Sequence, residues 1–173
     1  MILTKEELVA IHQNEIRVLL HLASKVEPAM LHYRPSPKQR SMLELLHYLV
    51  VMGPIRYRSI KAGEFDPDSW RTAWKAEEAA AKAMGLEEVK DALGKQPALL
   101  AELLDSCSDA DLRAEIEMFG RKASRGAMLA NLVLSHHAAY RMQLFLYLKA
   151  CGLEDLTSAN LWGGRDAAAQ ASS

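Results

Sequence analysis

The chain has 173 residues, of which 50% are hydrophobic, so it is long enough for one domain with its own apolar core. Its 21 lysines and arginines nearly balance 22 aspartates and glutamates, which leaves a formal net charge of −1. Because no basic stripe with interleaved aromatic residues accompanies this balance, we expect no nucleic-acid partner.

The start of the chain and its apolar segments predict a cytoplasmic protein without a membrane partner. The first residues, MILTKEELVAIHQNEI, lack the basic region and the continuous apolar run of a signal peptide. The richest apolar segment, 127–134, is too short to cross a membrane. The two cysteines, Cys107 and Cys151, have no CxxC spacing, which is typical of reduced thiols. No motif assigns them a role.

The first helix is predicted from about residue 5 to residue 25. Thr4 and Glu7 have the spacing of a capping box, in which each side chain bonds the other residue's backbone N–H. Apolar residues then recur at steps of three and four, which gives one buried stripe. Pro28 ends this helix, and the proline-rich stretch 35–37 makes a stiff connection.

A second capping box, Ser41 with Glu44, predicts the start of the second helix, which is apolar over a wide arc. The Gly53-Pro54 pair predicts a kink in it. After a loop at 66–69, residues 70–84 are typical of a shorter, alanine-rich helix that ends at a glycine.

Two further long helices complete the prediction. One covers much of 87–104, although Gly94 and Pro97 disfavour a single straight rod. Residues 109–122 are interpreted as a connection with at most a short helical turn. Ser124 is the expected N-cap of the last helix, which continues to about residue 149.

The predicted fold is all-α: a four-helix bundle with an additional short helix between helices 2 and 3. Few β-branched residues alternate as strands require. The whole chain, 1–173, is expected to be a single domain. Its tail, from about 164, has little to bury and is expected to be disordered unless a partner holds it.

One polar constellation is expected inside this fold. His136 and Tyr140 are four residues apart and share the inward face of the last helix. His137 lies about 100° further round, so we expect it nearer solvent or on a flank. His47 has apolar neighbours on its side of the second helix. Ring-bearing polar groups in a core are costly unless they bind something or each other.

Two interpretations of His47, His136 and Tyr140 remain open. As metal ligands they would form a three-point site with open positions, and imidazoles favour zinc, nickel, copper or iron. Tyr140 would have to lose its phenolic proton to become a good ligand. Alternatively, the histidines are core residues bonded to neighbouring helices, and His47 donates directly to Tyr140 without an ion.

Two segments resemble the DinB-like superfamily of four-helix bundles (the DinB/YfiT type). The first is RPSPKQRSMLELLHYL, a proline-rich approach to a serine-led helix with an inward histidine. The second is HHAAYRMQLFLYLKACG, where the family pattern has His, three residues, His, then Arg-Gly-Gln, an apolar run and a glycine. The resemblance spans most of the chain in order.

The resemblance assigns roles to individual residues. His47 matches the ligand of the second helix, and His136 matches the first ligand of the last helix. The ends of the Arg-Gly-Gln element fall on Arg141 and Gln143. This chain departs from the pattern at two places: Tyr140 stands where the second histidine is expected, and a methionine replaces the glycine.

The resemblance implies two functions for this fold. The first is a metal-dependent small-molecule enzyme, a thiol-linked transferase or isomerase or a hydrolase, with zinc or nickel at the three residues and a low-molecular-weight thiol as cofactor. The second is a non-catalytic bundle that has lost the metal and acts as a ligand-binding or structural protein. The family also implies a homodimer. Fold kinship does not choose among these roles.

Residues outside this constellation have weaker assignments. His12 and Glu15 fall on the inner side of the first helix. They could act as a base or as a hydrogen-bond partner to the ligands of an ion, or they could make ordinary hydrogen bonds. Trp70 and Trp74, one turn apart, form either a wall of a ligand pocket or an apolar patch that closes the fold. Trp162 is expected to anchor the tail to the body or to a second subunit.

Overall fold

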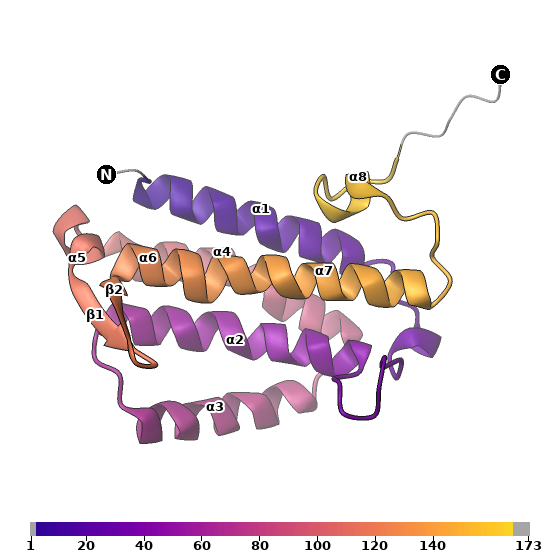
Figure 1. Cartoon of the computed structure of the whole chain (residues 1–173), viewed down its shortest axis with the longest axis horizontal. Coiled ribbons are helices and arrows are strands. Elements are labelled where there is room, and N and C mark those ends of the chain that lie inside the picture. Colours follow the sequence, from indigo (N-terminus) through magenta and orange to yellow (C-terminus); the bar gives the residue numbers. More distant parts are fainter. Residues whose placement is uncertain (1–2, 168–173) are drawn as a thin grey trace.

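The protein is predominantly helical, as the sequence predicts. A computed structural model describes residues 3–167. Four long helices lie side by side (Figure 1). The first and the third of them pack against each other, and the fourth packs against both the first and the second. These helices are α1 (Lys5–Ala23), α2 (Met42–Ala62), α4 (Leu86–Asp105) and α7 (Ser135–Ala150).

The helix starts follow the predicted capping boxes. Thr4 with Glu7 caps α1, and Ser41 with Glu44 caps α2. A short 3₁₀ turn, η1 (Pro28–Met30), lies between them. Helix α2 continues through Gly53-Pro54 and ends at Gly63, whose φ of 78° is favourable for glycine. Helix α4 likewise continues through Gly94 and Pro97.

The additional helix is α3 (Pro67–Lys82), which lies along α2 outside the other four helices (Figure 1) and, at 16 residues, is as long as α7 rather than short as predicted. It begins three residues before the predicted start because the Asp66 carboxylate accepts hydrogen bonds from the backbone N–H groups of residues 68 and 69. Proline at the first helical position suits this start. Only Ala81 is buried on α3, so most of this helix faces solvent.

Residues 109–124 contain the short helical turn that the prediction allowed, but they also form a β-hairpin that it did not include. Helix α5 (Asp109–Arg113) precedes antiparallel strands β1 (Glu115–Met118) and β2 (Arg121–Ser124). Phe119 and Gly120 form the turn with φ of 53° and 72°, as a two-residue hairpin with positive φ at both positions requires. Each strand has four residues, so the inward alternation of Ile116 and Met118 was too brief a signal.

The last helical segment has three parts. Ser124 caps it as predicted, and α6 (Arg125–Leu129) leads into a π-helical turn, η2 (Ala130–Leu134), and then into α7. The sequence did not predict the π turn. Such turns leave irregularly placed carbonyl groups and are frequent at functional sites.

The segment after α7 docks on α1. Helix α8 (Ser158–Leu161) is followed by backbone carbonyls at 163 and 164 that accept hydrogen bonds from Arg17 at 3.1 to 3.2 Å. Lys25 pairs with Asp166 at 2.6 Å. The tail therefore contacts the body as far as residue 166, and the predicted disorder of 168–173 lies outside the described residues.

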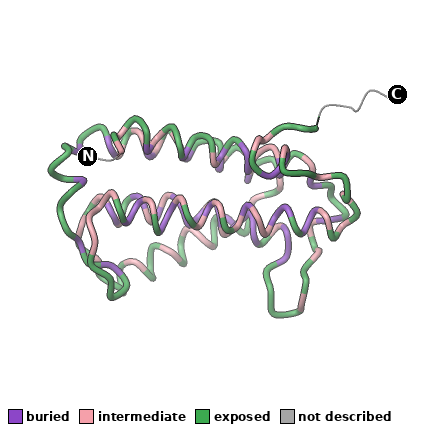
Figure 2. The backbone as a smooth tube through the Cα atoms, turned by 45° about the horizontal axis from the view of Figure 1, so that its top comes forward, coloured by how far each residue is buried: buried purple, intermediate pink, exposed green. Residues whose placement is uncertain are grey.

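Buried side chains line the inner faces of the four long helices (Figure 2). Among them, Leu19, Leu22, Leu45, Leu49 and Leu144 are fully buried. Within residues 3–167, every helix is too short or too polar to cross a membrane. Against this apolar interior the few buried polar side chains stand out, and they define the sites described next.

Candidate functional site

His47 lies at the junction between α2 and the α3–α4 connection. Its side chain is buried at 8% exposure, and Nε2 lies 2.9 Å from the carbonyl oxygen of Met84. Because a carbonyl oxygen only accepts, Nε2 of His47 carries a proton and donates it to Met84. His47 is therefore held by the backbone that joins α3 to α4.

His136 and Tyr140 lie elsewhere, around the guanidinium of Arg56. One amino group of Arg56 donates to the carbonyl oxygen of Leu132 and contacts Nδ1 of His136, which itself lies 2.7 Å from that carbonyl oxygen. Burial and Arg56 lower the pKa of His136 against the opposing effect of the Leu132 carbonyl, so the ring is neutral. The His136 and Tyr140 rings are 6.4 Å apart. Two of the three predicted ligands thus share a site with an arginine.

Tyr48 connects this arginine site with the surface. Its ring lies edge-on to Tyr140, with 4.8 Å between ring centroids. Burial and a hydrogen bond with Tyr140 raise the pKa of Tyr48 to about 12, so its hydroxyl keeps the proton at neutral pH. The guanidinium carbon of Arg40 lies over the Tyr48 ring, 4.1 Å from the ring centroid. We call Arg56, Tyr48, His136 and Tyr140 the arginine site.

A pocket of about 240 Å³ opens between α2 and α3 beside Tyr48 and His47. Its wall includes Trp74, the member of the tryptophan pair that lies 5.6 Å from Tyr48. Trp70 instead packs against Phe65 and Phe119. Trp74 therefore lies where a pocket wall was predicted, and Trp70 belongs to an apolar patch, the other predicted position. The α2–α3 pocket is lined by Arg40, Glu44, His47, Tyr48, Val51, Trp74, Glu78 and Lys82.

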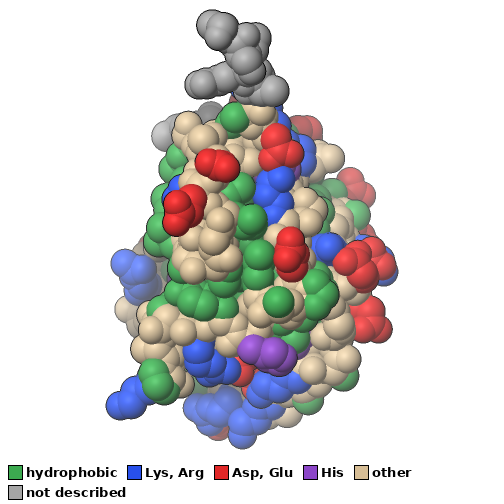
Figure 3. All heavy atoms as spheres, turned by 90° about the vertical axis from the view of Figure 1, so that its right-hand side faces the viewer, with side chains coloured by type: hydrophobic (Ala, Val, Ile, Leu, Met, Phe, Trp, Pro, Cys, Tyr) green, Lys and Arg blue, Asp and Glu red, His purple; other side chains and the backbone are tan. Residues whose placement is uncertain are grey.

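The surroundings of this pocket are basic. Figure 3 shows basic side chains gathered at the lower edge of the end of the molecule that carries the loop before α2. Arg34, Lys38 and Arg40 are exposed on that loop. The two carboxylates on the pocket wall already have cationic neighbours: Glu44 pairs with Arg34 and Glu78 with Lys82, both at 3.1 Å. The charge at the mouth of the α2–α3 pocket that no neighbouring side chain balances is therefore positive.

A second polar site, which the sequence did not predict as a unit, lies at the centre of the fold. His12, Tyr57, Gln96 and His137 come from α1, α2, α4 and α7, and each is 0 or 1% exposed. The Tyr57 hydroxyl contacts Nε2 of His12, and Nε2 of His137 lies 3.2 Å from Oε1 of Gln96. We call these four residues the buried cluster.

His137 is the residue that the sequence placed wrongly. It was expected near solvent or on a flank, yet it is 1% exposed. Helix α7 has neighbours on two sides, so one side carries His136 towards α2 while the other carries His137 towards α1, with the His12 and His137 rings 4.9 Å apart. The inward position predicted for His12 is confirmed. A glutamine in the apolar stripe of α4 was the available signal for the cluster.

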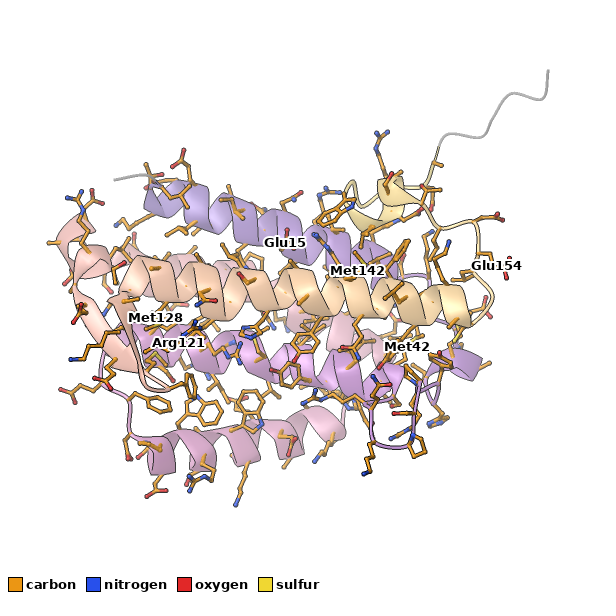
Figure 4. The ribbon with its side chains drawn as sticks, in the orientation of Figure 1. Glu15, Met42, Arg121, Met128, Met142 and Glu154 are labelled. Atoms are coloured by element: carbon orange, nitrogen blue, oxygen red, sulfur yellow. The ribbon has the colours of Figure 1, made fainter. Side chains whose placement is uncertain are left out.

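Beside the buried cluster, an ion pair joins α1 and α7. Arg141 is 2% exposed and donates to Glu15 at 2.7 Å. Figure 4 shows Glu15 between α1 and α7, close to Met142. Trp162 lies over the Arg141 guanidinium at 4.7 Å, as an anchor for the tail would. Gln143 donates to the Tyr147 hydroxyl at 2.6 Å. These residues support the helix packing.

Comparisons with known proteins agree with this architecture. A family model described as the DinB superfamily matches residues 11–142. The chain belongs to the DinB superfamily. That match includes His47, His136 and Tyr140, and it also includes all four residues of the buried cluster. A search of curated proteins found no match.

Two solved DinB-like proteins share the fold. The crystal structure of one from Bacillus subtilis matches with a TM-score of 0.63 at 20% identity, over 87% of this chain and 93% of that chain. One from Bacillus cereus ATCC 10987 matches with a TM-score of 0.66 at 17% identity, over 85% of this chain and 92% of the other. At these identities the likeness concerns the fold, so function within the DinB superfamily has to be argued from the site.

Proposed function

We propose that this DinB superfamily member, with its four long helices arranged as a bundle, binds a small organic anion in the α2–α3 pocket. We propose further that it works without a divalent ion among His47, His136 and Tyr140. The position of Arg56 is the observation that supports the second proposal, because its guanidinium lies beside His136 and Tyr140, two of the three side chains that would bind the ion.

The donor set at the arginine site does not fit a divalent ion. Nδ1 of His136 is engaged by both the Leu132 carbonyl oxygen, at 2.7 Å, and the Arg56 guanidinium, so an ion bound at this ring would lie close to a permanent positive charge. Two like unit charges 4 Å apart repel by about 4 kcal/mol at an effective dielectric constant of 20, and a divalent ion doubles this.

The pocket suits a small anion with an apolar part. Arg40 provides the positive charge at the mouth, and Trp74 and Tyr48 provide flat apolar surface. The Tyr48 hydroxyl, which keeps its proton, adds a hydrogen-bond donor. A volume of about 240 Å³ lies below the range of roughly 300–1,000 Å³ that is usual for drug-sized ligands, which favours a short or single-ring carboxylate.

Calorimetric titration with benzoate tests ligand binding, with benzamide as the uncharged counterpart. Benzoate should bind saturably and benzamide at least about tenfold more weakly, because the lost charge pair is worth more than about 1.4 kcal/mol. Arg40→Gln should remove the preference, whereas Lys38→Gln, on the same loop and outside the pocket wall, should keep it. Equal binding of the two compounds, or an unchanged preference in Arg40→Gln, would contradict the proposed ligand class.

Metal analysis of variants tests the role of Arg56. Tyr140→His restores the second histidine of the family pattern but keeps the guanidinium, so it should gain no metal at this position. Arg56→Met combined with Tyr140→His should gain one. If the metal content of the natural protein falls in His136→Ala, the metal-dependent enzyme becomes the better account.

A further inference from the structure

The buried cluster holds one polar side chain from each of the four long helices. Polar groups without access to water must be hydrogen-bonded to one another, since an unmatched group costs free energy. The protons available in the cluster can be assigned from its neighbours, and the assignment starts at Gln96.

Gln96 has its amide orientation fixed by α2. Its amide nitrogen donates to the carbonyl oxygens of Leu49 at 2.9 Å and Val50 at 3.3 Å. The Val50 carbonyl needs this donor because Pro54, four residues later, has no N–H to give it. Oε1 of Gln96 therefore faces the cluster, where it can only accept.

His137 lies between two acceptors. Its Nδ1 is 2.9 Å from the Val133 carbonyl oxygen, and its Nε2 is 3.2 Å from Oε1 of Gln96. Both rings are almost fully buried, and their contacts are with Tyr57, Gln96, each other and a backbone carbonyl rather than with a carboxylate. An imidazolium there would be an unpaired buried charge, so both rings are neutral. A neutral imidazole has one N–H, so one nitrogen lone pair of His137 must face an oxygen lone pair.

Tyr57 does not remove this conflict. Its hydroxyl contacts Nε2 of His12 and lies 3.5 Å from Oε1 of Gln96, but it has one proton to donate. Whichever neighbour receives that proton, His137 keeps one nitrogen lone pair opposite an oxygen, either that of Val133 or that of Gln96. The neutral cluster therefore lacks one electropositive partner, a role that a cation among these atoms can fill.

We propose that the buried cluster binds one divalent transition metal, for which zinc is the test ion. The ligands are Nε2 of His12, Nε2 of His137, Oε1 of Gln96 and Oη of Tyr57. The ion turns the opposed lone pairs into ligand bonds. Imidazole ligands favour zinc and its neighbours over magnesium or calcium. The Tyr57 hydroxyl loses its proton to solvent as the ion binds.

The separations of the ligand atoms suit this ion. Zinc bonds of about 2.0–2.1 Å to nitrogen and oxygen place tetrahedral ligands about 3.3 Å apart. Oε1 of Gln96 lies 3.2 Å from His137 Nε2 and 3.5 Å from Tyr57 Oη, while the closer His12–Tyr57 contact has to widen. Nδ1 of His137 donates to a backbone carbonyl, which is the usual arrangement on the far side of a metal-bound imidazole.

Three backbone irregularities converge on the buried cluster. A Cβ at Gly53 would lie 2.3 Å from Oε1 of Gln96 and 3.1 Å from Oη of Tyr57, so only glycine leaves room there. Pro54 frees the carbonyl that orients Gln96, and the π turn 130–134 immediately precedes the two histidines. A crevice of about 10 Å³ borders Tyr57, the cluster member nearest to it. This inference is independent of the proposed ligand in the α2–α3 pocket.

Titration of the full chain, purified without an affinity tag and stripped by a chelator, tests the inference. Zinc should bind with one equivalent at the cluster, and comparison of buffers with different ionisation enthalpies should show release of about one proton. Tyr57→Phe keeps the ring and removes the oxygen ligand, so it should weaken zinc binding at least about tenfold and abolish the proton release. Zinc should raise the melting temperature of the natural protein more than that of Tyr57→Phe.

The adjacent histidines provide the matched control. His137→Gln should lose the zinc equivalent, whereas His136→Gln, one residue away in the arginine site, should retain it. If His137→Gln does not fold, the comparison of Tyr57→Phe with the natural protein decides. Absence of zinc binding at micromolar concentration, or unchanged zinc binding in Tyr57→Phe, would overturn the inference.

Discussion

His136 and His137 are neighbours in sequence, but they serve two different polar sites on two sides of α7. In the arginine site, a permanent guanidinium lies beside His136 and supplies a positive charge. In the buried cluster, two imidazoles, a phenol and an amide contact one another, and within residues 3–167 no guanidinium or ammonium group donates to them. The contrast shows that the number of histidines says less about metal binding than the protons and charges that surround each ring.

Acidification should separate the two sites most strongly. The folded cluster resists protonation, since the pKa values of His12 and His137 lie at about 3 and 4, whereas unfolded histidines take a proton near pH 6.5. The stability of the metal-free protein should therefore be complete above pH 6.5 and fall below it, by about 2 kcal/mol for each ring at pH 5.

Chemical denaturation between pH 7.5 and pH 5 measures this slope. The His137→Gln variant should lose about half of this dependence of stability on pH. The His136→Gln variant should lose less of it, because the ring of His136 is less buried and already faces Arg56. A pH slope that is the same in both variants would show that the two sites do not differ in this way.

Gly53→Ala should disturb the buried cluster by steric overlap. Its new Cβ would lie 2.3 Å from Oε1 of Gln96, so we expect a loss of about 3 kcal/mol of unfolding free energy. Gly94→Ala is the control on α4, because the nearest atom to its Cβ is a Leu20 methyl group at 3.8 Å. That change should stabilise the protein by about 0.5–1 kcal/mol. Similar results for both glycines in denaturant unfolding would remove the argument for a cluster built around Gly53.

Arg56→Met should have a smaller effect, confined to the arginine site. It removes the guanidinium hydrogen bond to the Leu132 carbonyl and the contact with His136, which should cost about 1–2 kcal/mol of unfolding free energy. Arg58→Met provides the control two residues along α2, where the side chain is 53% exposed and pairs with Glu77. The Arg58→Met variant should lose less than about 1 kcal/mol of unfolding free energy. Thermal unfolding of the two variants would contradict the assignment if Arg58→Met were the more damaging.

The sequence predicted the elements that have local signals. Capping boxes at Thr4 and Ser41 and the serine cap at 124 marked three helix starts, because a short side chain bonds the first free N–H groups. The hairpin at 115–124 was missed, since four-residue strands give almost no alternation. The π turn was missed as well, and no local residue pattern marks it.

The sites were predicted less completely than the fold. The family pattern selected His47 and His136, but it gave no reason to consider Arg56, which lies on the helix of His47 more than two turns further on and reaches His136 only across the helix interface. His137 was assigned to a flank because helical phase alone does not show how many neighbours surround α7. Gln96 and Tyr57 join the histidines only through tertiary packing, so their role depends on distances that the sequence does not contain.

Anomalous diffraction from crystals grown with zinc tests the separation of the two sites most directly. The account predicts a zinc peak within bonding distance of His12 and His137, and an undisturbed guanidinium of Arg56 beside His136. A zinc ion bound to His136 and Tyr140, with Arg56 displaced, would contradict it.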